Sequence, residues 1–445
     1  MAEQLSSFDP ELYGLLAKEK IRQKECLNLI AGENYISQPV LEALSCSLSN
    51  DYADGYPGSR HGHSTEIVDQ IERLCQQRAL ETFRLDPSVW TVNVQAHSAS
   101  GANFAAFLGA VGPGGRIMGL HVPDGGHRTH GLYTEDRNIA ATSMIFQTLP
   151  YKADPVTKLV DYEQLEQMAM VFKPRLIIAG TSAYCRLLNY AKFRQICDKI
   201  NKCLLLADMA HISGLVAADV IPSPFDWADI VTTTTHKSLR GPRAGFIFYK
   251  KDLGDVGRRI DEAVYPALQS SPHLNVIAAA AVALKEAQSP SFKTYQKQVL
   301  KNARTLCDCM KRRGYKVYTD GTETHLCLID IRDLNLNRDK LGYILDEVGV
   351  LVSRAPSPTK IAPRMRLGAP AITSRGLTEE HMGNIVEFLH RGIQLTLKYQ
   401  HYGDDLSAFR EFCTSNPAAS EEIRRLKQEV IAFASVFHMP GHSNF

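Results

Sequence analysis

Between about Pro39 and Tyr249, short apolar runs alternate with stretches in which apolar residues recur at helical spacing. The apolar runs predict six strands, at residues 89–94, 116–120, 175–179, 203–207, 230–233 and 244–249. Strands separated by helices form βαβ units, whose strands lie parallel in one sheet. The pattern therefore predicts an α/β fold with a mostly parallel sheet.

The two ends of the chain have different patterns. Asp9-Pro10 predicts the start of an N-terminal helix. Beyond the predicted sheet, the patterns predict an Ala-rich helix at 276–286, strands at 315–318 and 326–331, and a closing helix at 421–437. Because 445 residues exceed what one core supports, we predict three parts: an N-terminal arm (1–38), a large domain that contains the predicted sheet (39–280) and a small α+β domain (281–445).

Composition narrows the class of protein. Hydrophobic residues make up 44% and charged residues 22%, and a net charge of +2 without a basic block gives no indication of nucleic-acid or membrane binding. The N-terminus lacks a targeting pattern, and no apolar run approaches the ~20 residues of a spanning helix, so we expect a cytoplasmic protein. The ten cysteines are scattered, and Cys307-x-Cys309 lacks a second ligand pair, so we predict reduced thiols and no metal site.

Reactive side chains follow three of the predicted strands. Ser182, Asp208 and Lys237 each come at or just after a strand end, the edge at which open α/β sheets bind ligands. Lys237 follows a run of four threonines and His236. Most lysines are solvated, but a lysine whose pKa is lowered by burial or by nearby cations forms an imine with an aldehyde cofactor. The context of Lys237 therefore decides between these two interpretations.

Motifs along nearly the whole chain supply that context. In order, they are Leu29-Ile-Ala-Gly-Glu-Asn34, Gly55-Tyr-Pro-Gly58, Asp124-Gly-Gly-His127-Arg-Thr-His130, Ala179-Gly-Thr-Ser182, Asp208-Met-Ala-His211, Thr235-His-Lys237 and Arg366-Leu-Gly-Ala-Pro. Together they resemble the serine (glycine) hydroxymethyltransferase family. The resemblance implies a fold of the aspartate-aminotransferase type (fold type I), pyridoxal 5'-phosphate as the cofactor, and interconversion of serine and glycine with tetrahydrofolate as the one-carbon carrier.

The resemblance also implies a role for each matching residue. Lys237 matches the Schiff-base lysine, Asp208 the partner of the pyridine nitrogen, His127 the imidazole that stacks on the ring, and Arg366 the group that binds the substrate carboxylate. The remaining cofactor-binding candidates are Ser182 and His211 near the ring hydroxyl, His236 beside the lysine, and Ser98 and Ser100, which precede a predicted helix and match the phosphate site. His211 is also a substrate-binding candidate.

Some of the matching residues imply a second subunit. Tyr52 matches a residue that reaches the phosphate of the partner subunit. Ser270 and Ser271 match a loop that contacts the same phosphate, in which the family has paired glycines. We therefore expect a homodimer or a dimer of dimers.

The sequence departs from the family pattern where substrate and folate would bind. Asp54 replaces the acid–base glutamate, and His61 and Gly62 replace two tyrosines. Gly32 replaces a serine that contacts the substrate carboxylate, and Arg128 replaces a leucine of the folate pocket. The stretch 352–366 is shorter than the resemblance implies, and a folate-contacting asparagine is missing there.

These departures leave three hypotheses open. In the first, the family reaction continues, with Asp54 as proton handler and with His61 or His63 replacing the lost donors, His61 also being a substrate-binding candidate. In the second, the protein cleaves β-hydroxy amino acids without folate, which the change at Arg128 and the missing asparagine favour. In the third, it is a non-catalytic dimer partner, which the losses at Gly32, Gly62 and the Ser270-Ser271 contact favour.

Overall fold

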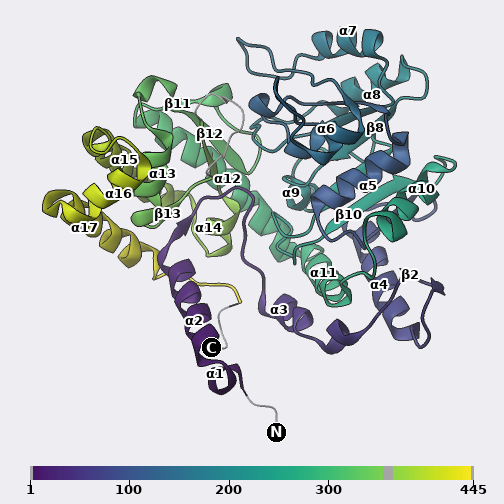
Figure 1. The fold of residues 1–445 in the computed structure, drawn as a ribbon, viewed down its shortest axis with the longest axis horizontal. Coiled ribbons are helices and arrows are strands. Elements are labelled where there is room, and N and C mark those ends of the chain that lie inside the picture. Colours follow the sequence, from purple (N-terminus) through teal and green to yellow (C-terminus); the bar gives the residue numbers. More distant parts are fainter. Residues whose placement is uncertain (1–3, 354–363, 442–445) are drawn as a thin grey trace.

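The computed structural model describes residues 4–353 and 364–441 and contains one large sheet (Figure 1). Its seven strands have the order β4-β10-β9-β8-β7-β5-β6, and only β10 lies antiparallel to its neighbours. The strands are β4 (Trp90–Asn93), β5 (Arg116–Gly119), β6 (Gln147–Thr148), β7 (Leu176–Gly180), β8 (Leu204–Asp208), β9 (Ile230–Thr234) and β10 (Gly245–Lys250). The predicted mostly parallel α/β sheet is confirmed, and only β6 was missed.

Both faces of this sheet are covered by helices, which explains the continuous apolar runs of its strands. One face packs against α5 (Ala99–Val111) and α10 (Val256–Glu262) through Ile178 and Leu206. The other face packs Ile177 and Leu205 into a separate core. Helices that contribute to this second core are α4 (Glu66–Thr82), α7 (Tyr162–Phe172), α8 (Tyr190–Asp198), α11 (Leu274–Ala287) and α12 (Pro290–Arg312).

The C-terminal third builds its own core around a small antiparallel sheet of order β11-β12-β14. The strands are β11 (Lys316–Val317), β12 (Leu326–Asp330) and β14 (Arg364–Gly368), and the helices are α13 (Arg338–Glu347), α14 (Pro370–Ser374), α15 (Met382–Tyr399), α16 (Leu406–Ser415) and α17 (Pro417–Ala434). The N-terminal segment reaches this core, because β1 (Leu27–Asn28) pairs with β13 (Val350–Leu351). The domain boundary at residue 280 falls inside α11 and stays a prediction.

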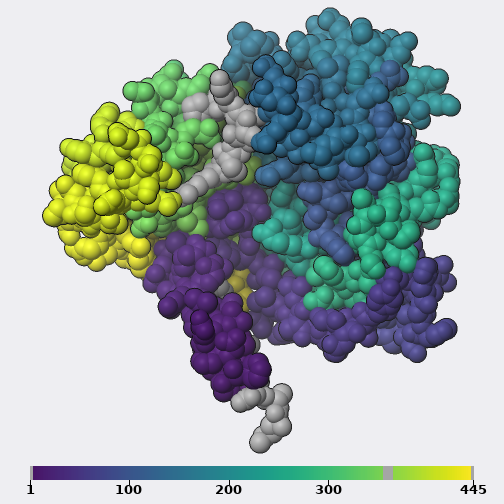
Figure 2. All heavy atoms as spheres, viewed as in Figure 1, coloured from purple at the N-terminus to yellow at the C-terminus, as the bar shows by residue number. Residues whose placement is uncertain are grey.

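The N-terminal arm is a helix that projects from the rest of the molecule (Figures 1 and 2). Asp9 caps α2 (Pro10–Glu25) by accepting a hydrogen bond from the N–H of Leu12 at 2.9 Å, as the sequence predicts. No residue of α2 is buried, and Leu15 and Ile21 are both more than half exposed. Neither α2 nor any other described helix has the length and apolar character needed to cross a membrane.

Candidate active site

Lys237 lies three residues beyond β9, in a segment that begins with the buried threonines 232–235. Burial lowers the pKa of the Lys237 amine to about 8; the charge of Asp208 opposes this shift, and the charges of Arg366 and Arg243 add to it. A large fraction of the amine is therefore neutral at mildly alkaline pH. The neutral amine is the form that attacks an aldehyde, so the strand end provides a lysine suited to imine formation.

Asp208 is the last residue of β8 and is 8% exposed. Its Oδ2 accepts hydrogen bonds from His130 Nε2 at 2.9 Å and from Asn103 Nδ2 at 2.8 Å, and its Oδ1 accepts one from the N–H of Ala210 at 3.1 Å. Burial acts to raise the pKa of this carboxyl, but His130 and Asn103, together with the charge of His127, hold the pKa well below its usual range. Asp208 is therefore a buried carboxylate that keeps its charge.

His127 lies beside this carboxylate. Its Nδ1 is 2.7 Å from Thr129 Oγ1, which accepts a hydrogen bond from Asn103 at 2.9 Å. Burial, with the charge of His130 as the next contribution, lowers the pKa of His127 to about 3. The ligand atoms of His127, His130 and Asp208 all lie within 4.8 Å of one another, which is also a metal-ligand spacing. Oδ2 of Asp208 already accepts hydrogen bonds from His130 and Asn103. We therefore interpret the group as a hydrogen-bonded Asp208 carboxylate beside the neutral His127 ring, and not as a metal site.

Arg366 lies in β14 of the small sheet and is hydrogen-bonded to the segment that follows β7 of the large sheet. Its Nη1 donates to the carbonyl oxygen of Ser182 at 2.6 Å, and its Nη2 donates to Ser353 Oγ at 3.0 Å. Burial lowers the pKa of Arg366 to about 10, so the guanidinium stays charged at neutral pH. Ser182 Oγ also lies 3.3 Å from His211 Nε2. A partly buried cation therefore lies at the same sheet edge as Lys237.

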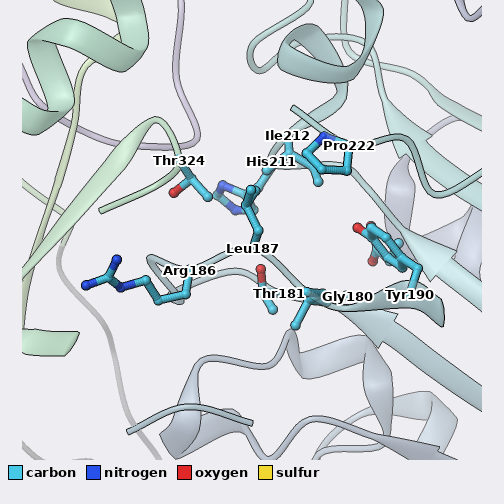
Figure 3. Close-up of a pocket in the computed structure, with 11 residues that line it drawn as sticks. Gly180, Thr181, Arg186, Leu187, Tyr190, His211, Ile212, Pro222 and Thr324 are labelled. Atoms are coloured by element: carbon cyan, nitrogen blue, oxygen red, sulfur yellow. The ribbon is translucent and has the colours of Figure 1, made fainter. Parts of the chain in front are cut away.

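His211 completes this side of the site. Its Nδ1 lies 3.2 Å from Nε2 of His325, and burial holds the pKa of His211 well below its usual value. His211 and Tyr190 face a cavity of about 20 Å³ behind the site (Figure 3). A Cβ added to Gly32 would lie 3.8 Å from Lys237 Cε and 3.9 Å from His211 Cε1, so Gly32 lines the space beside the lysine.

The predicted phosphate site is the N-terminus of α5. Ser98 is the N-cap, and its Oγ accepts a hydrogen bond from the N–H of Gly101 at 3.2 Å. Ser98 and Ser100 are not buried, which leaves the helix terminus open to an anion. His236 lies at the same sheet edge, and its Nδ1 is buried without a partner among the described residues. Burial lowers the pKa of His236 to about 3.

The remaining predicted site residues gather in a second cluster, with one another rather than with Lys237. Asp54 is 6% exposed and accepts hydrogen bonds from Tyr52 Oη at 2.5 Å and from Ser270 Oγ at 3.2 Å. Ser271 Oγ accepts a hydrogen bond from the N–H of Ala53 at 2.7 Å. The backbone N–H of His61 donates a hydrogen bond to the backbone carbonyl oxygen of Asp54 at 3.0 Å. The loop that contains the serines also contacts the residue before Ser98, because Gln269 Oε1 accepts from the N–H of His97 at 3.3 Å.

Two of the departures from the family pattern have simple positions. Arg128 directly follows His127 as the first residue of the short helix η3 (Arg128–His130), and it is exposed. A Cβ added to Gly62 would meet only the carbonyl oxygen of Tyr52, at 3.9 Å. Most of the shortened stretch 352–366, with its missing asparagine, lies outside the described residues.

A partly buried lysine at a sheet edge, next to a buried carboxylate and a partly buried arginine, is the arrangement of enzymes that handle carboxylate substrates through a lysine imine. Comparison with known proteins narrows this class. The family model described as serine hydroxymethyltransferase matches residues 5–389. The serine hydroxymethyltransferase of Caenorhabditis elegans is 45% identical over 100% of this chain and 91% of its own length.

Two further relatives extend the comparison. The cytosolic serine hydroxymethyltransferase of Oryctolagus cuniculus is 45% identical, covering 100% of this chain and 96% of the relative. Serine hydroxymethyltransferase 4 of Arabidopsis thaliana is 47% identical, and the match covers 98% of this chain and 96% of the relative. The chain belongs to the serine hydroxymethyltransferase family, whose members are pyridoxal-phosphate-dependent enzymes of fold type I.

Proposed function

We propose that this protein interconverts serine and glycine at a site built on Lys237, with pyridoxal 5'-phosphate as cofactor and tetrahydrofolate as one-carbon carrier. The observation that carries the proposal is the position of Lys237 just beyond the end of β9, at the sheet edge where β8 ends in the Asp208 carboxylate. Burial lowers the pKa of the Lys237 amine to about 8, which suits imine formation. The residues present fit the cofactor. An amine for the aldehyde, a charged carboxylate for the ring nitrogen and an open helix N-terminus for the phosphate share one sheet edge.

The roles of the residues follow from their contacts. When bound, pyridoxal phosphate supplies an electron sink for the bonds at the substrate Cα. Asp208 keeps a proton on the ring nitrogen, because its own pKa is held low. His127 offers a neutral ring face, and Arg366 orients the substrate by binding its carboxylate. Ser98, Ser100 and the N–H groups of α5 hold the phosphate.

Reduction with borohydride tests the cofactor assignment. Protein incubated with pyridoxal phosphate and then reduced is expected to retain a pyridoxyl group on Lys237, located by peptide mass spectrometry. The Lys237→Ala variant is expected to retain none. A wild-type protein that stays unmodified would refute the proposal.

A homodimer completes the proposed site. No hydrogen bond or ion pair among the described residues joins Lys237 of the same chain to the cluster of Tyr52, Asp54, His61, Ser270 and Ser271. We infer that this cluster serves Lys237 of a second copy. The projecting helix α2, with its exposed apolar side chains, supports this assembly because it is free to pack against that copy.

Subunit mixing tests the sharing of residues. Lys237→Ala and Asp54→Ala are each expected to be inactive as homodimers. After mixing and exchange, each mixed dimer has one intact site, so about a quarter of the wild-type activity is expected to return. If no activity returns although mixed dimers are present, each chain uses its own Asp54 and the sharing is wrong.

A second candidate function is folate-independent cleavage of β-hydroxy amino acids. It is favoured by Arg128, an exposed cation next to His127 in place of an apolar side chain. Release of glycine from a β-hydroxy amino acid, measured with and without tetrahydrofolate, separates the two functions. A cytosolic location is supported by the cytosolic relative, whereas serine hydroxymethyltransferase 3 of Arabidopsis thaliana is chloroplastic.

A further inference from the structure

Tyr265 joins the second cluster from a separate element. It lies in η4 (Ala263–Leu268), and its Oη is 3.3 Å from Nδ1 of His61. The Tyr265 ring meets the His61 ring edge-on, with centroids 5.6 Å apart, and it meets the Tyr56 ring in the same way at 6.5 Å. The phenol is therefore held between packed rings, and its hydroxyl is directed at the imidazole.

The other neighbour of this hydroxyl is the Asp54 carboxylate. Burial, the charge of Asp54 and a hydrogen bond to it raise the pKa of Tyr265. The phenol therefore stays protonated and donates a hydrogen bond to the carboxylate. Arg60 does not neutralise Asp54, because its guanidinium bonds Asp69 at 2.9 Å and Glu72 at 2.6 Å. Arg60 is therefore not available to Asp54, whose hydrogen-bond donors include Tyr52 and Ser270.

We propose that Tyr265 is a positioning residue that links His61 to Asp54, so that His61 handles protons in place of the tyrosine implied at position 61. Nδ1–H of His61 donates to Tyr265, whose O–H donates to Asp54. This arrangement leaves Nε2 of His61, to which nothing in the described part of the chain bonds, as the base. Nε2 accepts the proton of the substrate hydroxyl as the Cα–Cβ bond breaks and returns it in the reverse direction.

This inference rests on the proposed function, so its first test does not use activity. Diethyl pyrocarbonate acylates the unprotonated ring nitrogen of a neutral histidine, and mass spectrometry of the His61 peptide follows the rate in the holoprotein. Tyr265→Phe removes only the hydroxyl that accepts the hydrogen bond from Nδ1–H, so Nε2 becomes a weaker nucleophile and the rate at His61 is expected to fall about twofold. Tyr402→Phe, at an exposed tyrosine that stacks on Phe412, is the matched control and is expected to leave the rate unchanged. An unchanged rate in Tyr265→Phe would overturn the proposal even if the protein proves to have another activity.

The second test uses turnover of serine and tetrahydrofolate. Tyr265→Phe is expected to lower kcat about tenfold at an unchanged KM for serine, because Arg366 still binds the carboxylate. In the His61→Ala background the same change is expected to have no further effect, since Tyr265 acts through His61. His61→Tyr combined with Tyr265→Phe returns the phenol to position 61 and is expected to recover activity. If the losses of kcat in Tyr265→Phe and His61→Ala multiply in the double variant, Tyr265 does not act through His61, and the proposal is overturned.

Discussion

Gly32 provides the sharpest test of how the substrate carboxylate is bound. The family pattern has a serine at this position that contacts the substrate carboxylate, and Gly32 lacks that hydroxyl. The structure has room for it, because a Cβ at Gly32 would make only ordinary contacts, 3.8 Å from Lys237 Cε and 3.9 Å from His211 Cε1. The backbone of Gly32 also lies outside the left-handed region, so Gly32→Ser introduces no strain.

The magnitude follows from one added hydrogen bond. A hydrogen bond to a charged group contributes about 1.5–3 kcal/mol, and about 1.4 kcal/mol corresponds to a factor of ten. Taking the lower limit, because the new hydroxyl is also desolvated before substrate binds, Gly32→Ser is expected to lower KM for serine about tenfold. Because the contact is present in the ground state and the transition state alike, kcat is expected to change by less than about twofold.

Steady-state kinetics at saturating tetrahydrofolate measures both constants. The matched control is Gly383→Ser on α15, where an added Cβ meets nothing within 4 Å and the backbone is again unstrained. Both variants lose a similar amount of unfolded-chain entropy, so a similar small gain in thermal stability is expected in each. If KM in Gly32→Ser stays equal to that of the control, the carboxylate does not bind beside Gly32, and the placement of the substrate against Arg366 is wrong.

Two further predictions concern stability. Arg60→Ala leaves Asp69 and Glu72 as buried carboxylates without their partner, and it is expected to lower the free energy of unfolding by about 3–5 kcal/mol in denaturant unfolding. Arg258→Ala, at an exposed surface ion pair, is the control and is expected to change the free energy of unfolding little. Equal losses in the two variants would contradict the structural role of Arg60. In the apoprotein, the pKa of Lys237 falls from the ordinary lysine value of 10.5 to about 8 on folding, so the unfolded chain binds more protons between these pH values and the free energy of unfolding rises with pH across that window. Across this window, the free energy of unfolding is expected to rise by on the order of 3 kcal/mol more than in the Lys237→Met variant. Parallel pH curves for the two proteins would show that the amine is not buried.

The positions of the residues assigned to the cofactor side were predictable from the sequence, because those positions depend on strands. Strands such as β7 and β8 are buried on both faces, so their apolar runs are recognisable without knowledge of their neighbours. Parallel strands end at one edge, and this placed Asp208 and Lys237 together before any contact was known. The short strand β6 was missed because two residues at a sheet edge produce no periodic pattern.

Contacts between distant segments were not predictable. Asn103 and His130 hold Asp208, but they come from α5 and η3, and only the register of these elements against β8 brings them to the carboxylate. His130 belongs to one of the recognised motifs, and a histidine three residues after His127 was a usable signal. Tyr265 gave none, since its role depends on a contact with His61 across 204 positions of sequence.

The departures from the family pattern lie where the structure tolerates change. At the sheet edge, an added Cβ at Gly180 would lie 2.6 Å from the Cβ of Asp208, and one at Gly245 would lie 2.4 Å from the carbonyl oxygen of Ser98. No side chain fits there without moving a strand, so these glycines are fixed by packing. Gly32 and Gly62 meet nothing closer than 3.8 Å, and substitution in either direction leaves the core unchanged. The groups that contact substrate can therefore be exchanged while the cofactor edge stays intact, which is why the chain combines a complete lysine site with an altered second cluster.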